Sequence, residues 1–159
     1  MTIADLKPIG PANVPVSGKI KDLPPLLLGG AVFNQQFNDN PENLPAEEML
    51  KIAFNKGISA IDTSPYYGPS EIILGNALKN IKPEFPRENY YIVTKAGRVK
   101  LNDFDYRPES IRKSVLRSLE RLDTDYLDLV YLHDVEFVSE DKILKALVEL
   151  KNLKSQGII

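Results

Sequence analysis

The feature that most constrains this chain is a short apolar run followed by a segment with helical spacing, an arrangement that recurs four times. The runs, rich in aliphatic, β-branched and aromatic side chains, occupy residues 26–33, 58–62, 90–95 and 128–133. Continuous apolar runs of this length are typical of parallel strands that are covered on both faces. Their starts, at 26, 58, 90 and 128, lie about 32 to 38 residues apart, which accommodates a strand, a turn and a helix. We therefore expect right-handed βαβ units.

The segments that follow the runs carry helix signals, so the expected order of elements is β-α four times. The first three segments open with a proline and an acidic residue within two positions, at Pro45, Pro69 and Pro108, as the first turn of a helix favours. Gly57 and Gly157 follow the ends of the first and fourth segments as C-terminal caps. The third and fourth segments have apolar side chains three or four positions apart: Ile111, Val115, Leu119 and Leu122, then Ile143, Leu147 and Leu150.

This repeat suits either a doubly wound α/β sheet or a (β/α)8 barrel. A full barrel needs about 200–250 residues, so at this repeat the 159 residues hold half of one. We expect residues 26–159 to supply the first four βα units of a longer protein, with 157–159 leading into a fifth strand. Residues 1–25 hold five of the chain's 12 prolines and are expected to form an irregular extension or a small hairpin.

The composition excludes several classes of protein. Twenty basic against 22 acidic residues give a net charge of −2 and a pI of about 5.5, which argues against a nucleic-acid-binding protein. The absence of cysteine excludes a disulfide scaffold and a thiolate zinc site, and we expect no metal. No apolar run approaches the roughly 18–20 residues that span a bilayer. The first residues lack a secretory pattern, so we expect a cytoplasmic protein with no membrane partner.

Three of the predicted strands end in an ionisable side chain, namely Asp62, Lys95 and His133. Each alone has a simpler explanation: an aspartate caps a turn, a lysine reaches solvent, and a histidine forms hydrogen bonds in a core. Catalytic groups of parallel α/β folds nevertheless gather at the carboxyl ends of strands. Three such residues in three successive units therefore indicate a site.

The loop after the second strand adds Tyr67, whose hydroxyl could reach the space between these three side chains. A phenol with the ordinary pKa of about 10 is a weak acid or base at neutral pH. An adjacent ammonium stabilises the phenolate, a carboxylate holds the ammonium in place, and a histidine can orient a substrate oxygen. The four residues together predict a proton-transfer site that needs no metal and no covalent nucleophile.

Several segments around these residues resemble the aldo-keto reductases. The segment 61–68 followed by Ser70 and Glu71 is similar to the family's signature, including the five-residue step from Asp62 to Tyr67, and 93–95 and 132–133 match the two other catalytic positions. The resemblance implies a (β/α)8 TIM barrel that binds NAD or NADP without a Rossmann domain. The glycine pair at 29–30 agrees, because it is not a G-x-G-x-x-G fingerprint.

The resemblance also implies roles for individual residues. Tyr67 would be the general acid/base, Lys95 would stabilise its phenolate, Asp62 would hold Lys95, and His133 would orient the reacting oxygen. The cofactor-binding residues would be Gly30, Ala31 and Asp62, and the substrate-binding residues would be His133, Tyr67 and Arg98. Most of the family's cofactor contacts come from the second half of the barrel, which this chain lacks.

At a finer level, several segments are similar to the fungal NAD-dependent D-arabinose 1-dehydrogenases within that family. They are residues 28–31 followed by 34–36, then 65–71, 94–98 and 132–137. This similarity implies oxidation of D-arabinose to D-arabinono-1,4-lactone, a step toward erythroascorbate. The partner would be a small sugar or aldehyde substrate.

Three alternatives remain at this stage. Lys95 could be the nucleophile of a Schiff-base lyase, the chain could be a non-catalytic binding subunit with this fold, or it could be an inactive truncated fragment. Half a barrel leaves open apolar edges, so we expect the segment alone to be inactive and poorly soluble unless it pairs with the missing C-terminal half or with itself. The basic residues Arg112, Lys113, Arg117 and Arg121 are expected on the outer face of the third helix.

Overall fold

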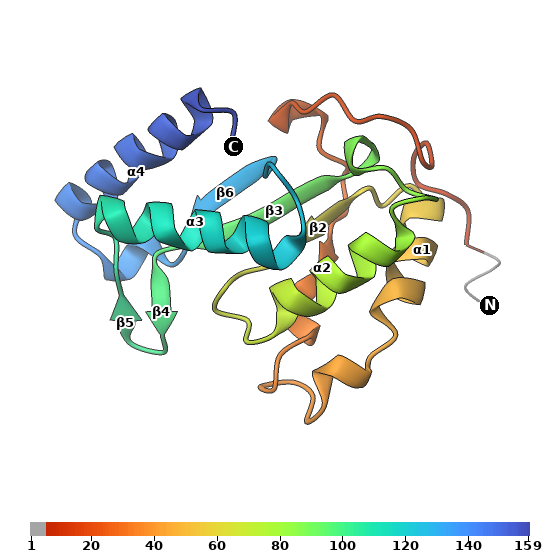
Figure 1. The fold of residues 1–159 in the computed structure, drawn as a ribbon, viewed down its shortest axis with the longest axis horizontal. Helices are drawn as coiled ribbons and strands as arrows, with labels where there is room; N and C mark the ends of the chain where they lie inside the picture. The colour runs from red at the N-terminus through yellow and green to blue at the C-terminus, as the bar shows by residue number, and fades with distance from the viewer. Residues whose placement is uncertain (1–5) are drawn as a thin grey trace.

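The computed structural model describes residues 6–159, in which four parallel strands form one sheet (Figure 1). The strands are β1 (Leu28–Gly29), β2 (Ala60–Asp62), β3 (Tyr91–Ala96) and β6 (Leu129–Leu132). Each pairs in parallel with the next in chain order, giving β1-β2-β3-β6. A doubly wound sheet reverses its strand order at a switch point, and this sheet has no reversal. The order is therefore that of a barrel.

Four helices form a layer over the sheet, and each packs against the next in chain order (Figure 1). They are α1 (Ala46–Asn55), α2 (Ser70–Ile81), α3 (Pro108–Leu122) and α4 (Glu140–Ser155). All four occupy the predicted places. Asp123 ends α3 in the left-handed conformation at φ 52°, and Gly157 follows α4 at φ 73°, where a glycine carries no Cβ penalty. Short 3₁₀ helices lie at Ile20–Asp22, Gly30–Val32, Pro41–Asn43, Arg87–Asn89 and Val135–Phe137.

The hydrophobic core lies between the strands and the helices. The rings of Phe54 and Tyr90 stack with centroids 4.9 Å apart, and Phe85 meets Phe54 edge-on at 5.4 Å. Such aromatic pairs contribute about 0.5–1.5 kcal/mol beyond their buried area. Each of the four helices and both β2 and β3 contribute fully buried aliphatic side chains, among them Leu50, Ile61, Leu74, Ile92, Ile111 and Leu153, and Leu127 is buried just before β6.

The prediction of a continuous strand over 26–33 was wrong. Only Leu28–Gly29 is strand, and the chain then turns through the 3₁₀ helix Gly30–Val32. Packing at Gly30 explains the turn, because the Ser70 hydroxyl donates to the Gly30 carbonyl at 2.8 Å. A Cβ at Gly30 would come within 2.9 Å of Asp62 O, Ser70 Oγ and Leu74 Cδ1. Leu26 and Leu27, counted in that strand, are instead exposed.

A small antiparallel hairpin, β4 (Arg98–Lys100) and β5 (Asp103–Phe104), lies between β3 and α3 and was not predicted. The chain leaves β3 through Gly97 at φ 108°, a conformation that side chains disfavour. A Cβ there would also meet the Tyr106 ring at 2.4 Å. The hairpin is short and exposed, so no apolar alternation marks it in the sequence.

The N-terminal extension is irregular over its described part. No strand forms within residues 6–25, so the described part of the predicted extension holds no hairpin, and residues 1–5 of that extension lie outside the described residues. The segment is fixed by backbone hydrogen bonds from Ile9 N to Lys56 O and from Val16 N to Glu88 O. No helix among residues 6–159 is long and apolar enough to cross a membrane.

Candidate active site

Three of the predicted catalytic side chains lie at the carboxyl ends of neighbouring strands. Asp62 is the last residue of β2, Lys95 precedes the last residue of β3, and His133 directly follows β6. The register pairs Asp62 with Val93, and the His133 backbone N donates to Ala96 O at 2.9 Å. Because these strands are parallel and neighbouring, the three residues reach the same edge of the sheet, where sites of parallel α/β folds are built.

Lys95 is anchored by two oxygen atoms. Its Nζ donates to Asp62 Oδ1 at 2.6 Å and to the Thr63 carbonyl at 3.0 Å. The pair is largely shielded from water, with the two side chains 15% and 29% exposed, so their attraction is stronger than that of a surface pair. Lys95 is engaged in an ion pair with Asp62, whereas a Schiff-base nucleophile must present a free amine to its substrate. The geometry therefore disfavours the lyase.

Tyr67 lies in the loop between β2 and α2, directly over Lys95. The Lys95 ammonium is 4.8 Å from the centroid of the Tyr67 ring. The same ring meets His133 edge-on, with centroids 5.8 Å apart and planes at 87°. The turn is fixed by hydrogen bonds from Tyr67 N to Ser64 O and from Ser70 N to Tyr67 O. All four predicted side chains are therefore brought together.

His133 is buried and held from two sides. Its Nδ1 is 3.0 Å from the Ser64 hydroxyl, and the Tyr106 hydroxyl donates to its backbone carbonyl at 2.7 Å. Burial lowers the pKa of His133 below its ordinary value of 6.5, and the nearby Lys95 and Arg98 cations act in the same direction, while Asp134 opposes them. The imidazole is therefore neutral at neutral pH.

Since His133 is the chain's one histidine, its titration can be followed without assignment. We expect its ring proton to titrate by NMR with a midpoint below 6.5, because the buried site disfavours the imidazolium. The unfolded chain binds this proton first, so the free energy of unfolding should fall as the pH drops from about 6.5 toward the lowered midpoint. His133→Gln should remove that part of the pH dependence. A midpoint at or above 6.5 would contradict the assigned neutral state.

The comparisons with known proteins decide the family. The sequence profile of the aldo/keto reductase family matches residues 25–159. The chain belongs to this family. It is 58% identical to the D-arabinose 1-dehydrogenase of Saccharomyces cerevisiae over 135 residues, which cover 85% of this chain and 40% of that protein. It is 39% identical to the L-galactose dehydrogenase of Arabidopsis thaliana over 160 residues, which cover 99% of this chain and 47% of that protein.

Comparison with a solved structure supports the fold. The glycerol dehydrogenase of Gluconobacter oxydans superposes with a TM-score of 0.68 at 29% identity, covering 91% of this chain and 45% of that one. The chain therefore spans less than half the length of each of these three relatives. Its sheet is part of an aldo/keto reductase barrel, which confirms the predicted family and fold class.

The predicted cofactor residues of this aldo/keto reductase differ in accessibility. Asp62 and Ala31 are partly exposed at the carboxyl edge, whereas Gly30 is buried. Gly29 pairs with Asp62 in the β1–β2 register, and a Cβ there would have no neighbour within 4 Å. The space around the Gly29 Cα at the β1 edge is therefore open. Gly30 serves the fold, since its missing side chain permits the turn beneath Ala31.

Arg98 lies behind the catalytic residues. Its guanidinium stacks on the Tyr66 ring at 4.0 Å and pairs with Asp134, and the Tyr66 ring lies 5.7 Å from that of His133. The side chain is 18% exposed, so it is not a solvated surface arginine. It supports the wall of the site through Tyr66.

Ser64 and Tyr106 contact His133 and were missed by the sequence analysis. Ser64 belongs to the loop that carries Tyr67, and its position within the signature segment 61–68 is the signal that could have found it. Tyr106 lies 27 residues before His133 in the chain, and nothing local to the sequence shows that they meet. Among residues 6–159, no cluster of three potential metal-ligating His, Cys, Asp or Glu side chains is present.

Proposed function

We propose that this chain carries the proton-transfer residues of an NAD(P)-dependent sugar dehydrogenase that oxidises D-arabinose at its anomeric carbon to D-arabinono-1,4-lactone. The contact between Lys95 Nζ and Asp62 Oδ1, with the Tyr67 ring 4.8 Å from the same ammonium, is the observation that carries the proposal. An ammonium this close to the Tyr67 ring supports a role for Lys95 in stabilising the phenolate. We place the enzyme in the cytoplasm, which suits a chain without cysteine.

In the proposed reaction, Tyr67 accepts the proton of the anomeric hydroxyl and returns it when the reaction runs toward a carbonyl. Lys95 stabilises the charge on the phenolate oxygen, and Asp62 holds Lys95 in place. The nicotinamide cofactor, when bound, would accept the hydride that leaves the anomeric carbon. Asp62 and Ala31 would hold its amide end, beside the tight turn at Gly30.

His133 orients the reacting oxygen. Ser64 Oγ accepts a hydrogen bond from the Tyr66 backbone N at 3.1 Å, which leaves its own proton free to donate to His133 Nδ1. Asp134 Oδ2 lies 3.8 Å from the other ring nitrogen, Nε2. Both contacts favour the tautomer with the proton on Nε2, which would make His133 a neutral hydrogen-bond donor to the substrate.

The names of the relatives support a sugar as substrate. Beside the D-arabinose and L-galactose dehydrogenases, the chain is 31% identical to the D-threo-aldose 1-dehydrogenase of a Pseudomonas species over 86% of its length. We propose NAD as the preferred cofactor. An NADH-specific methylglyoxal reductase of Escherichia coli, 38% identical over 82% of this chain, supports that preference and makes carbonyl reduction the second candidate reaction.

The test is absorbance at 340 nm with NAD or NADP and a panel of D-arabinose, L-galactose and methylglyoxal. It should be run on the chain alone and on the chain combined with the second half of a barrel from a relative. We expect NADH formation from D-arabinose in the completed barrel. The same barrel binding NAD without oxidising or reducing any of these compounds would contradict the proposal and favour a non-catalytic subunit.

A further inference from the structure

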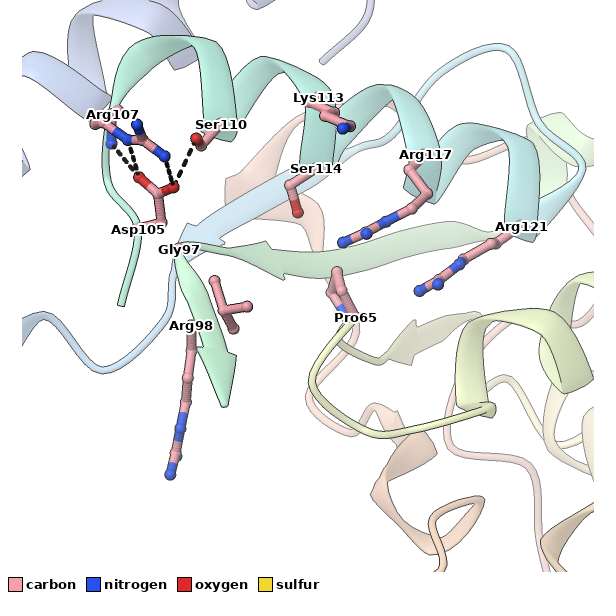
Figure 2. A pocket seen from close by; sticks show the side chains of 11 residues that line it. Pro65, Gly97, Arg98, Asp105, Arg107, Ser110, Lys113, Ser114, Arg117 and Arg121 are labelled. Carbon is pink, nitrogen blue, oxygen red and sulfur yellow. Dashed lines mark hydrogen bonds and ion pairs between the residues drawn. The ribbon is translucent and has the colours of Figure 1, made fainter. Parts of the chain in front are cut away.

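A cavity opens on α3, apart from the four catalytic side chains. It measures about 450 Å³, a volume typical of small-molecule pockets, and is lined by α3 together with Pro65 and the turn at Gly97 and Val99 (Figure 2). Neither Tyr67, Lys95 nor His133 lines it. We refer to it below as the α3 pocket.

Three cations of α3 line this pocket at four-residue intervals: Lys113, Arg117 and Arg121. Arg117 and Arg121 extend from the helix toward the loop that carries Pro65 (Figure 2). Like charges four residues apart destabilise a helix. Three such cations on one helix face stand out in a chain whose net charge is −2. Such an arrangement becomes favourable when an anion lies between the charges.

The other charged groups of the pocket are already neutralised. Arg107 binds Asp105 through two nitrogen atoms. Arg98 also lines the pocket, but its guanidinium pairs with Asp134 and extends away from Arg117 and Arg121 (Figure 2). The charge of Arg121 is partly neutralised as well, since its guanidinium lies 3.5 Å from the fully buried Glu71 carboxylate.

Lys113 and Arg117 remain uncompensated. Both are exposed, and neither forms an ion pair with any residue in the range 6–159. The Ser114 hydroxyl lines the same cavity one turn before Ser118, whose own hydroxyl donates to the Ser114 carbonyl. The pocket therefore offers two unpaired cations, a third that is half-engaged, and a hydroxyl donor.

We propose that the α3 pocket is a binding site for a small phosphorylated molecule. Guanidinium groups form paired hydrogen bonds with phosphate oxygens, and an ammonium adds a compact charge. A doubly charged phosphate group matches Lys113 and Arg117 in charge, and the cavity has room for the molecule that carries it. Because Pro65 belongs to the loop that carries Tyr67, the bound molecule would lie against the outer side of that loop.

Isothermal titration with inorganic pyrophosphate tests the proposal without any assay of catalysis. The double variant Lys113→Gln/Arg117→Gln removes both unpaired cations from exposed positions, so folding should be preserved, as circular dichroism can verify. Arg121 is left in place because it neutralises Glu71. We expect the double variant to bind pyrophosphate at least about tenfold more weakly than the unsubstituted protein. Raising the salt concentration should weaken binding to the unsubstituted protein more than to the variant.

The matched control is Lys21→Gln/Lys151→Gln, which makes the same change in charge at exposed positions outside the pocket. It should bind pyrophosphate as the unsubstituted protein does. Equal weakening in both double variants would show a general charge effect and overturn the proposal. So would equal affinity for pyrophosphate and for sulfate, because the pocket would then bind only an adventitious ion.

Discussion

Replacing Tyr67 with phenylalanine is expected to lower the kcat of the completed barrel for D-arabinose by about 10²- to 10⁴-fold, the range typical of a lost general acid/base. The substitution removes one hydroxyl and keeps the ring that packs over Lys95 and against His133. Substrate binding should change little, because the hydroxyl acts mainly in the transition state. Steady-state NADH formation at 340 nm measures both kcat and KM.

Tyr66→Phe is the matched control for that substitution. Tyr66 is the next residue in the same loop, and its ring also lies against His133, but it packs on Arg98 and not on Lys95. Its loss of a hydroxyl should leave kcat within a few-fold of the unsubstituted value. Equal losses in the two variants would assign the effect to the loop as a whole. A Tyr67→Phe enzyme that keeps a tenth or more of its activity would rule out Tyr67 as the general acid/base.

The fold was predictable where a strand is buried on both faces, because burial on both faces gives a continuous apolar run in the sequence. The β3 run at 90–95 is covered by helices and by neighbouring strands, so its continuous apolar character corresponds to a strand of nearly that length, Tyr91–Ala96. The run at 26–33 has the same character but lies at the edge of the sheet. There, tertiary packing of Gly30 against Ser70 and Leu74 ends the strand after Gly29, and a sequence pattern does not show such packing.

The site was predictable where each residue follows a recognisable strand. Asp62, Lys95 and His133 come at strand ends, so the parallel arrangement alone places them together. Contacts such as that between Tyr106 and His133 depend on how the exposed hairpin after β3 folds back, and no periodicity encodes that fold.

The basic residues of α3 also show that a sequence pattern does not encode tertiary contacts. Their spacing indicated an exposed helix face, and Lys113 and Arg117 are exposed. Arg112, however, turns the other way and pairs with Glu149 of α4. The cavity that the remaining three share is formed with the Pro65 loop, from a distant part of the chain.

Gly75→Ala is expected to cause the largest loss of stability. Gly75 lies within α2, where a Cβ would come within 2.0 Å of the Arg121 carbonyl oxygen and 2.9 Å of Leu122 Cα on α3. Both are backbone atoms, so no side-chain rotation relieves the overlap and the two helices must move apart. Alanine favours the helix itself by about 1 kcal/mol over glycine. We expect the overlap to exceed this gain, with a net loss of about 3 kcal/mol or more in the free energy of unfolding.

Urea unfolding followed by circular dichroism measures this loss as a shift of the midpoint. Asn76→Ala is the control, since Asn76 is the exposed neighbour of Gly75 on the same helix and gains helix propensity without meeting α3. Its midpoint should stay the same or rise slightly. A Gly75→Ala midpoint equal to or above that of the unsubstituted protein would show that α2 and α3 are not in close backbone contact. Because α2 begins directly after the Tyr67 loop and α3 directly after the hairpin that follows Lys95, separating these helices should also displace the two catalytic residues from each other.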